Sequence, residues 1–314
     1  MQKLLITRCL PDRVIAAAKT RFDVIYRDST TPLSPAELRT ALRDYDAILP
    51  TLGDLFRADV FADVPEPRAR ILANFGVGFN HIDTAAARTA GVRVTNTPGA
   101  VTDATADIAL TLILMTARRA GEGERLVRGG TWAGWHPTQM LGTHVTGKTV
   151  GIIGMGRIGQ AVAKRCHFGF GMDVLFHNRS PLALNYASQV PLAKALKADF
   201  VVLAVPASPA TRHLMGAETL SQMRPTAILI NIARGDVVDE SALIAALQSR
   251  QIAGAGLDVY EQEPKVPAAL VALENVTLLP HLGTAALEVR EAMGMMALAN
   301  LTAYLDGHPL PNPV

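Results

Sequence analysis

Three side chains of the types used to reduce a carbonyl group lie in the second half of the chain. Arg234, Glu263 and His281 each stand a few residues beyond a short apolar run. An arginine can hold a carboxylate through two parallel hydrogen bonds, and a histidine can give a proton to a carbonyl oxygen as a hydride arrives. A glutamate beside that histidine would favour its protonated form. Together these types suit the reduction of a 2-oxo acid, although each alone is also compatible with a surface or helix-cap position.

A glycine-rich segment supplies the second chemical signal. Residues 149–159 read TVGIIGMGRIG, an apolar run followed by the pattern GxGxxG, and an amphipathic stretch follows. Gly154 permits a tight turn, Gly156 lets the backbone approach a pyrophosphate, and Gly159 lets a helix pack closely on a strand. The N-terminus of that helix would add amide donors for phosphate. The strand before and the helix after favour a dinucleotide site over a purely structural glycine turn.

The residues expected to read the adenine ribose lie about 20 positions beyond the glycines. An NAD site usually has Asp or Glu there, but the run 176–180 is Phe-His-Asn-Arg-Ser. Arg179, with Asn178 and Ser180 beside it, suits a 2′-phosphate, which a carboxylate would repel. The sequence therefore predicts NADP, with NADPH preferred over NADH; the alternative is that Arg179 is a solvated surface residue.

Short apolar runs alternate with amphipathic stretches along the whole chain, which is typical of repeated βα units in parallel sheets. Arg234, Glu263 and His281 would then all follow the carboxyl ends of parallel strands, where open α/β sheets bind ligands. The expected strands are 3–7, 23–26, 47–50, 71–74, 93–95, 149–153, 173–176, 200–204, 227–231, 255–259 and 276–279. The expected helices are 12–21, 35–42, 58–64, 84–90, 101–120, 160–167 and 285–305.

Two turn-forming segments, 96–99 and 280–283, mark candidate crossings between domains. They predict an α/β protein with two doubly wound parallel-sheet domains. The smaller, substrate domain would comprise residues 1–98 and 285–314. The dinucleotide-binding domain, residues 99–284, would be inserted into it.

The stretch 101–120 is rich in Ala, Leu, Ile and Met and has few charges before Arg118. It predicts a helix that is apolar on most sides, and such helices are buried by something. Burial within its own domain and partial burial against another subunit both remain open.

Composition narrows the class of protein. The chain has 314 residues, 49% of them hydrophobic, and 30 Lys and Arg against 28 Asp and Glu, for a formal net charge of +2. That length and apolar content predict two folded domains rather than a disordered chain. Near charge balance argues against a nucleic-acid partner. No apolar run approaches the roughly 18 residues of a membrane span, so a cytoplasmic protein is expected.

The cysteines and histidines predict no metal. Cys9 and Cys166 lie far apart and fit neither a disulfide framework nor a metal knuckle. No group of His, Cys and carboxylates has metal-ligand spacing either. Both thiols are therefore expected to be small, reduced, buried side chains.

The sequence resembles the D-isomer-specific 2-hydroxyacid dehydrogenase family over nearly its whole length. The resemblance implies that Arg234, Glu263 and His281 are catalytic, with Arg234 and His281 also contacting substrate. It implies a Rossmann dinucleotide-binding domain inserted into a flavodoxin-like substrate domain, and a homodimer joined through the dinucleotide-binding domains. The segments that carry it are 74–83, 147–160, 231–236, 257–264 and 280–284.

Further contacts follow from the same resemblance. Asp258 would meet the nicotinamide carboxamide, Thr105 would lie near the cofactor, and the backbone amides of Val77 and Gly78 would bind the substrate carboxylate. Leu52 is expected to be a further substrate contact. The remaining expected cofactor contacts are Arg157, Ile158, Val205, Pro206, Ala233 and Gly283.

The Asn-Arg-Ser triplet resembles the glyoxylate/hydroxypyruvate reductase branch, whose members often prefer NADPH. The expected activity is NADPH-dependent reduction of glyoxylate or hydroxypyruvate to the D-2-hydroxy acid, with His281 as proton donor. Alternatives are a dehydrogenase for a different acid, such as formate or an aryl-pyruvate, and a non-catalytic NAD(P)-sensing protein similar to a corepressor. Gln139 stands where some reductases of that branch carry Trp; Trp132 and Trp135 are nearby candidates for that role.

Overall fold

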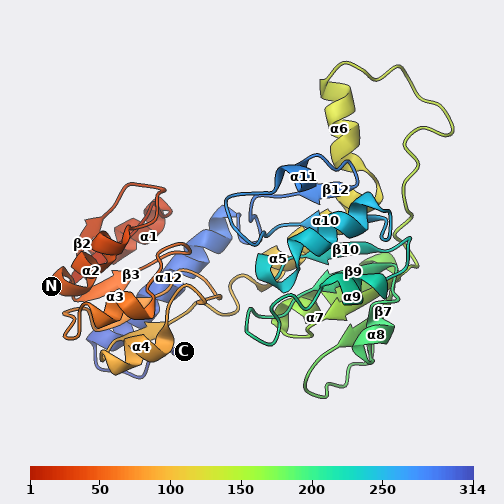
Figure 1. Cartoon of the computed structure of the whole chain (residues 1–314). Helices are drawn as coiled ribbons and strands as arrows, with labels where there is room; N and C mark the ends of the chain where they lie inside the picture. Colours follow the sequence, from red (N-terminus) through yellow and green to blue (C-terminus); the bar gives the residue numbers. More distant parts are fainter. The chain divides into compact units, whose positions relative to one another are not determined.

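The computed structural model describes residues 1–314 and divides into two compact units. Unit 1 comprises Met1–Val101 and Thr284–Val314, and unit 2 comprises Thr102–Gly283 (Figure 1). The chain leaves unit 1 after Val101 and returns at Thr284, so unit 2 is an insertion. Each unit is a parallel sheet with helices on both faces, which confirms the predicted fold class.

The sheet of unit 1 has five parallel strands in the order β2-β1-β3-β4-β5. This is the strand order of flavodoxin-like folds, as expected for the smaller domain. The strands are β1 (Lys3–Ile6), β2 (Asp23–Tyr26), β3 (Ala47–Leu49), β4 (Ile71–Ala73) and β5 (Arg93–Thr95).

Successive side chains of each strand in unit 1 point to opposite faces of the sheet, and helices pack on both faces. Leu5, Ile48 and Leu72 point to one face of the sheet and share a core with the buried side chains of three helices. The opposite face is covered by two helices, one of which belongs to the C-terminal segment. The first three are α2 (Pro35–Asp44), α3 (Ala58–Ala62) and α4 (Thr84–Thr89), and the other two are α1 (Asp12–Lys19) and α12 (Leu287–Leu305).

The sheet of unit 2 has seven parallel strands in the order β12-β11-β10-β9-β6-β7-β8. Counted from β6, this is the Rossmann order with one more strand at the β12 edge. The strands are β6 (Thr149–Ile153), β7 (Asp173–His177), β8 (Ser188–Gln189), β9 (Phe200–Leu203), β10 (Ile228–Asn231), β11 (Gly254–Leu257) and β12 (Val276–Leu278).

Two apolar cores lie on the two faces of this sheet. Val150, Val202 and Ile230 contribute to one core, with α5 (Thr102–Ala117) and α7 (Arg157–Lys164). Val201 and Leu229 contribute to the other. Because neighbouring residues of a strand point to opposite faces, continuous apolar strands feed both cores. The helices of the second face are α8 (Leu192–Ala195), α9 (Ala217–Ser221), α10 (Glu240–Gln248) and α11 (Ala268–Val271).

The structure differs from the sequence-based elements where the apolar pattern is weak. The expected helix 101–120 ends at Ala117; the chain turns at Arg119 in a left-handed conformation (φ 53°), and a separate helix, α6 (Ala120–Arg128), begins. None of the residues of α6 is buried, and its sequence, AGEGERLVR, contains two glycines, which disfavour a helix. The helix expected at 160–167 begins earlier, at Arg157, and continues as one π-helical turn, Arg165–Gly169.

Helix α5 packs against α7, β10 and β11 of its own unit, and its buried side chains include Ala109, Leu112 and Ile113. Most of its apolar surface is therefore covered within unit 2. No helix in the chain combines the length and the apolar character that crossing a membrane requires.

Candidate active site

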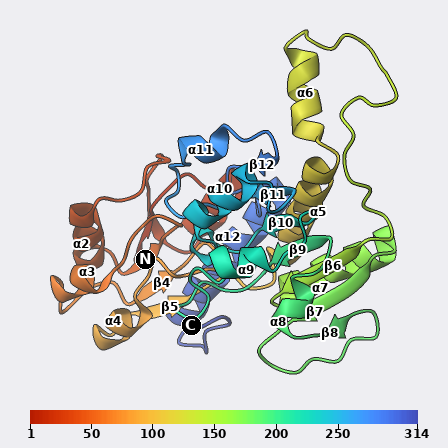
Figure 2. The same cartoon turned by 45° about the vertical axis from the view of Figure 1, so that its right-hand side comes forward.

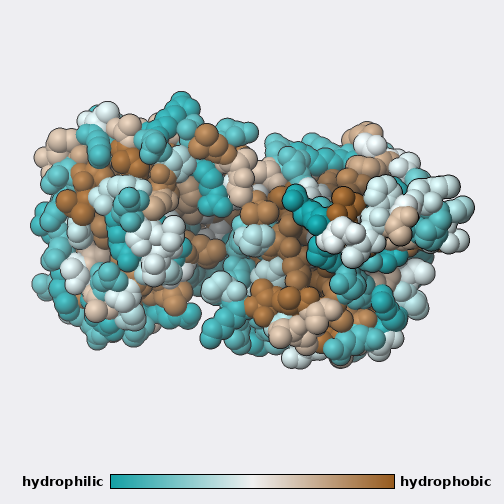
Figure 3. Space-filling model, turned by 90° about the horizontal axis from the view of Figure 1, so that it is seen from above, coloured by the Kyte–Doolittle hydropathy of each residue, from teal (hydrophilic) through white to brown (hydrophobic).

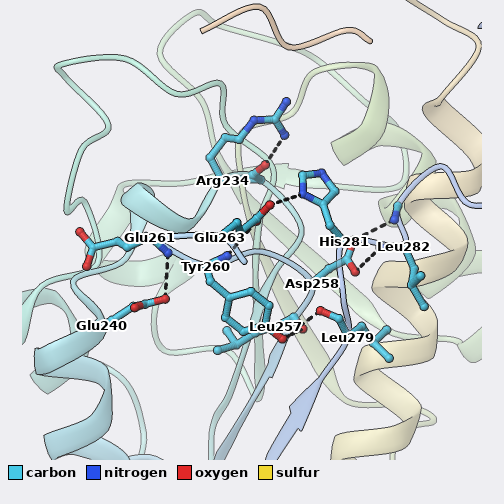
Figure 4. Close-up of polar contacts among 12 residues, drawn as sticks. Arg234, Glu240, Leu257, Asp258, Tyr260, Glu261, Glu263, Leu279, His281 and Leu282 are labelled. Carbon is cyan, nitrogen blue, oxygen red and sulfur yellow. Dashed lines mark hydrogen bonds and ion pairs between the residues drawn. The ribbon is translucent and has the colours of Figure 1, made fainter. Parts of the chain in front are cut away.

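Unit 2 brings Arg234, Glu263 and His281 together at one edge of its sheet (Figure 4). They follow β10, β11 and β12, which are neighbours in the sheet and parallel. The carboxyl ends of the three strands therefore meet, and the loops beyond them converge. Position in the fold, rather than nearness in the sequence, creates this group.

His281 and Glu263 form a hydrogen-bonded pair. The His281 Nδ1 atom lies 2.8 Å from Glu263 Oε2, and each side chain is 30% exposed. The backbone N–H of His281 donates to the Asp258 carbonyl at 3.0 Å, and its φ of 57° directs the ring toward Glu263. The His281 Nε2 atom makes no hydrogen bond within the protein, so it remains available to a ligand.

The electrostatics of Glu263 favour its ionised form. Burial alone would raise the pKa of this carboxyl group. The hydrogen bond and charge of His281, the N–H of Tyr260 that donates to Oε1 at 3.0 Å, and the charge of Arg234 together hold the pKa below its usual value. A carboxylate that stays ionised beside a histidine stabilises the protonated ring and fixes its orientation.

Arg234 is held mainly by its own loop. Its Nη1 donates to the Ala233 carbonyl at 2.7 Å, and it forms no ion pair closer than 4.0 Å. Burial lowers the pKa of the guanidinium, and the negative charges of Glu263 and Asp236 oppose that shift. A half-buried arginine that has unused donors suits a carboxylate ligand.

An asparagine that the sequence analysis did not single out shapes this loop. Asn231 Nδ2 donates to the Arg234 carbonyl at 2.9 Å, and Asn231 Oδ1 accepts from the Ala233 N–H at 3.0 Å. The Arg234 backbone is thereby fixed from two sides. The available sequence signal was an asparagine at the end of an apolar strand, three residues before an arginine.

Asp258 anchors the loop that carries His281. Its side chain is 2% exposed and accepts from the N–H groups of Leu282 at 2.6 Å and Gly283 at 2.8 Å. Burial raises the pKa of this carboxyl group, while those two hydrogen bonds and His281 oppose the increase. Thr105 Oγ1 donates to the Gly283 carbonyl at 3.0 Å, so Thr105, Asp258 and Gly283 also lie together.

The glycine-rich segment connects β6 to α7 as the motif predicts. Gly154 has φ 98°, and a Cβ atom there would lie 2.7 Å from the Ala204 carbonyl oxygen. A Cβ on Gly159 would overlap the carbonyl oxygen of Gly154. A Cβ on Gly156 would meet no protein atom within 4 Å, so space is left above the N-terminus of α7. This cradle of backbone N–H groups fits a pyrophosphate.

The end of β7 carries the triplet expected at the adenine ribose. Asn178 Oδ1 accepts from the Met155 N–H at 3.3 Å, and Asn178 Nδ2 donates to the Ser180 carbonyl at 2.9 Å. Gln189 of β8, not expected from the sequence, donates to the Asn178 carbonyl at 3.0 Å. Arg179 is exposed and has no ion pair, so its guanidinium is available.

The other expected cofactor residues lie on neighbouring segments of unit 2. Arg157 and Ile158 begin α7, and Arg157 is exposed without an ion pair. Val205 and Pro206 follow β9, and a Cβ on Gly154 would lie 2.8 Å from Val205 Cγ1. Ala233 lies in the loop of Arg234.

The expected substrate contacts outside Arg234 and His281 belong to unit 1. Leu52 follows β3 and is 39% exposed. Val77 and Gly78 follow β4 and are half-buried. All three lie beyond the carboxyl ends of strands in their own sheet.

A second histidine–glutamate pair lies beside the first and was not expected. His213 Nε2 lies 2.5 Å from Glu261 Oε1. The Glu261 N–H donates to Glu240 Oε1 at 2.9 Å (Figure 4). The backbone N–H of His213 donates to the Asp236 carbonyl at 2.7 Å. His213 therefore joins the loop of Arg234 to the loop of Glu263. A separation of 48 residues gave no sequence signal for the pair.

Comparison with known proteins agrees with this geometry. The family model described as "D-isomer specific 2-hydroxyacid dehydrogenase, NAD binding domain" matches residues 110–283, which lie within unit 2. A glyoxylate reductase of Thermococcus gammatolerans is 45% identical over 321 residues, covering 99% of this chain and 95% of the relative. A glyoxylate reductase of Pyrococcus furiosus is 43% identical over 324 residues, with 99% and 95% covered.

A solved structure is similar over the full length. The NADPH-dependent glyoxylate/hydroxypyruvate reductase of Sinorhizobium meliloti, in complex with NADP and malonate, matches with a TM-score of 0.89 and 34% identity. The match covers 100% of this chain and 96% of that one. The chain thus belongs to the D-isomer-specific 2-hydroxyacid dehydrogenase family, and it is an NAD(P)-dependent oxidoreductase.

Proposed function

We propose that the chain reduces a small 2-oxo acid, glyoxylate or hydroxypyruvate, to the D-2-hydroxy acid with NADPH. The observation that carries this proposal is the 2.8 Å pair of His281 Nδ1 and Glu263 Oε2, with His281 Nε2 left to a ligand. The names of the similar proteins point to the same substrates, and one of them is described as NADPH-dependent.

In this reaction His281 is the proton donor. With Nδ1–H directed to the Glu263 carboxylate, the protonated ring presents Nε2–H to the carbonyl oxygen. The bound dinucleotide supplies the hydride that the carbonyl carbon accepts. As the oxygen gains negative charge, it takes the Nε2 proton, and the ring is left neutral with its Nδ1–H still donated to Glu263. Glu263 thus keeps the ring in one orientation through the cycle.

Arg234 binds the substrate carboxylate. Its half-buried guanidinium has donors that no protein group uses, and its loop is fixed by Asn231. A carboxylate held there places the neighbouring carbonyl at a defined distance from His281. We assign further substrate contacts in unit 1 to the backbone N–H groups of Val77 and Gly78 and to Leu52. Dinucleotide binding is assigned to unit 2, which also carries Arg234 and His281.

The preference for NADPH rests on the end of β7. No carboxylate stands there, and Asn178 Oδ1 already accepts from the Met155 N–H. The exposed, unpaired guanidinium of Arg179 is a donor for a 2′-phosphate. Thr105, Asp258 and Gly283, which the structure groups beside His281, are assigned to the nicotinamide end.

We also assign a homodimer formed through unit 2. Helix α6 and the segment that follows it project from the rest of the unit in both views (Figures 1 and 2). This segment exposes large apolar side chains, with Trp135 78% and Leu141 68% exposed. Figure 3 shows brown apolar side chains among teal and white ones on both units, unit 2 included. Exposed apolar surface of this kind favours contact with another chain.

A cleft next to α6 would receive the partner's projecting segment. Its volume is about 710 Å³, and its lining includes Arg119, Glu122, Arg125 and Leu141. It lies at the amino ends of the strands, on the side of the sheet away from His281, which makes it unsuited to the substrate.

Light scattering of the full chain at micromolar concentration should give twice the 33.4 kDa chain mass, and the mass of one chain would exclude this dimer.

A turnover assay tests the activity. The full chain is mixed with NADPH or NADH and with a panel of acids containing glyoxylate, hydroxypyruvate, pyruvate and phenylpyruvate, and formate is offered with NADP or NAD. Highest kcat/KM for glyoxylate or hydroxypyruvate is expected. Highest kcat/KM for phenylpyruvate would show that the substrate is an aryl-pyruvate, and turnover of formate alone would show that it is formate. Cofactor binding without any turnover would indicate a sensing protein.

A further inference from the structure

A turn in unit 1 has its carbonyl groups occupied and two of its N–H groups without acceptors. The turn 75–78 follows β4. The carbonyl of Gly76 accepts from the Thr97 N–H at 3.1 Å and from a side-chain amide, and the carbonyls of Val77 and Gly78 accept from side-chain amides as well. The N–H groups of Val77 and Gly78 donate to no protein atom. The turn therefore offers N–H donors to a ligand, while its carbonyl acceptors are already hydrogen-bonded within the protein.

Asn74 produces most of this asymmetry. Its side chain is fully buried, and its Nδ2 donates to the carbonyls of both Gly76 and Gly78 at 3.0 Å. Two carbonyl oxygens turned toward one amide cannot point at a ligand. The C=O and N–H of one trans peptide group point in opposite directions, so holding the Gly76 carbonyl on Asn74 directs the Val77 N–H away from it.

Asn96 completes the arrangement from another segment. It follows β5, and its Nδ2 donates to the Val77 carbonyl at 2.8 Å. All three successive carbonyls of the turn are thus bound by two asparagine amides. A carbonyl dipole facing an incoming carboxylate would repel it, so this removes the main obstacle to anion binding at the turn.

His81 sets the orientation of Asn74. Its Nε2 lies 3.0 Å from Asn74 Oδ1, and both side chains are buried. Because the Asn74 NH₂ group faces two carbonyls, its oxygen faces His81, and His81 Nε2 must carry the donated proton. The ring therefore prevents the amide from reversing, which would turn an oxygen toward the Gly76 and Gly78 carbonyls.

We infer that Asn74, Asn96 and His81 are positioning residues that make the turn 75–78 a receptor for the substrate carboxylate. The inference rests on the proposed function, and it adds residues that never touch substrate. Their role is to hold the Val77 and Gly78 N–H groups outward before substrate arrives. Such preorganisation lowers the free energy spent on ordering the site during binding.

The first test exchanges the amide for an isosteric acceptor. Asn74→Asp puts a carboxylate against two carbonyl oxygens, and Asn96→Asp does the same at the Val77 carbonyl. We expect each variant to raise KM for the 2-oxo acid about tenfold or more. The dissociation constant of oxalate, a carboxylate probe that cannot be reduced, should rise by the same factor when measured by calorimetry. The dissociation constant of NADPH should stay within about twofold of wild type. Unchanged KM and oxalate affinity in a folded variant would overturn the inference.

Rescue by a conservative change tests His81. His81→Gln keeps an amide nitrogen near the position of Nε2, whereas His81→Leu removes the donor. We expect KM and oxalate affinity near wild type for the glutamine variant and a several-fold loss for the leucine variant. Equal values for the two variants would exclude the proposed role of the histidine.

Asn275 offers a matched control. Its Nδ2 also donates to two backbone carbonyls, of Leu247 at 3.5 Å and Ala253 at 3.2 Å, but in unit 2. Asn275→Asp should lower the melting temperature without changing KM or oxalate affinity. If it raised KM as Asn74→Asp does, the effect would be general loosening and the inference would be wrong. Should the wild type reduce no 2-oxo acid, the proposed function fails separately, while oxalate binding still reports on the turn.

Discussion

Gly235 packs so closely against Tyr260 that a methyl group on its Cα would overlap the Tyr260 carbonyl carbon. Gly235 directly follows Arg234, and Tyr260 donates its N–H to Glu263. The loop that carries the arginine and the loop that carries the glutamate are therefore in backbone contact. The relative position of Arg234 and Glu263 depends on a residue with no side chain.

Gly235→Ala should separate the two loops. We expect the free energy of unfolding to fall by about 1–3 kcal/mol, as for other overpacked sites, and kcat/KM to fall more than stability alone would explain. Urea denaturation and steady-state kinetics measure both. Gly169→Ala is the control, because a Cβ there meets no atom within 4 Å. Wild-type kinetics in the Gly235 variant would show that the contact does not set the site.

Removing the proposed proton donor should slow the chemical step. His281→Ala is expected to lower kcat by about 10²–10⁴ while the NADPH dissociation constant changes little. Stopped-flow measurement of NADPH oxidation and fluorescence titration of NADPH separate the two quantities. Turnover close to wild type in a folded variant would remove His281 from the mechanism.

The pH dependence should report the pairing of His281 with Glu263. The pKa of Glu263 lies below its usual value, so the carboxylate is ionised throughout the neutral range and stabilises the protonated ring. Glu263→Gln removes that charge. Because the proposed proton donor then lacks a negative charge beside it, we expect the high-pH limb of kcat for the reduction to move to lower pH. A limb at the wild-type position would mean that the two groups are not coupled.

The carboxylate contact should require the planar guanidinium. Arg234→Lys keeps the positive charge but offers a single ammonium group in place of two parallel donors. KM for the 2-oxo acid is expected to rise and kcat to fall, with NADPH binding retained. Steady-state kinetics with glyoxylate and hydroxypyruvate measure this. Identical KM and kcat for the variant and the wild type would show that Arg234 is not the carboxylate ligand.

Cofactor preference should depend on Arg179. A hydrogen bond to a charged group contributes about 1.5–3 kcal/mol, or roughly 10- to 150-fold in affinity. We expect kcat/KM for NADPH to exceed that for NADH by at least about tenfold, and Arg179→Ala to remove most of the difference by weakening NADPH use. Adding Asn178→Asp should shift preference toward NADH. Equal use of both cofactors by the wild type would contradict this interpretation of the end of β7.

The sequence predicted those parts of the molecule that depend on local patterns. Apolar runs located every strand except β8 to within a residue or two, and the spacing of Gly154, Gly156 and Gly159 predicted the turn between β6 and α7. Arg234, Glu263 and His281 could be proposed together because each follows a strand. Parallel order then requires that they share an edge.

Features formed between loops could not be predicted in this way. His213 and Glu261 meet only because the loops after β9 and β11 are packed on the loop after β10. Neither residue stands in a periodic pattern. Helix α6 was not predicted for a different reason: two of its nine residues are glycines, which disfavour a helix, and none of its residues is buried.

The hydrogen bond from Thr105 Oγ1 to the Gly283 carbonyl joins the beginning of unit 2 to its end. A segment whose ends are adjacent can be placed in a surface loop of another protein without stretching either partner. Unit 2 is therefore a continuous insertion whose presence interrupts neither sheet. The same closeness of ends makes unit 2 suitable for circular permutation, with new termini opened at the exposed segment after α6.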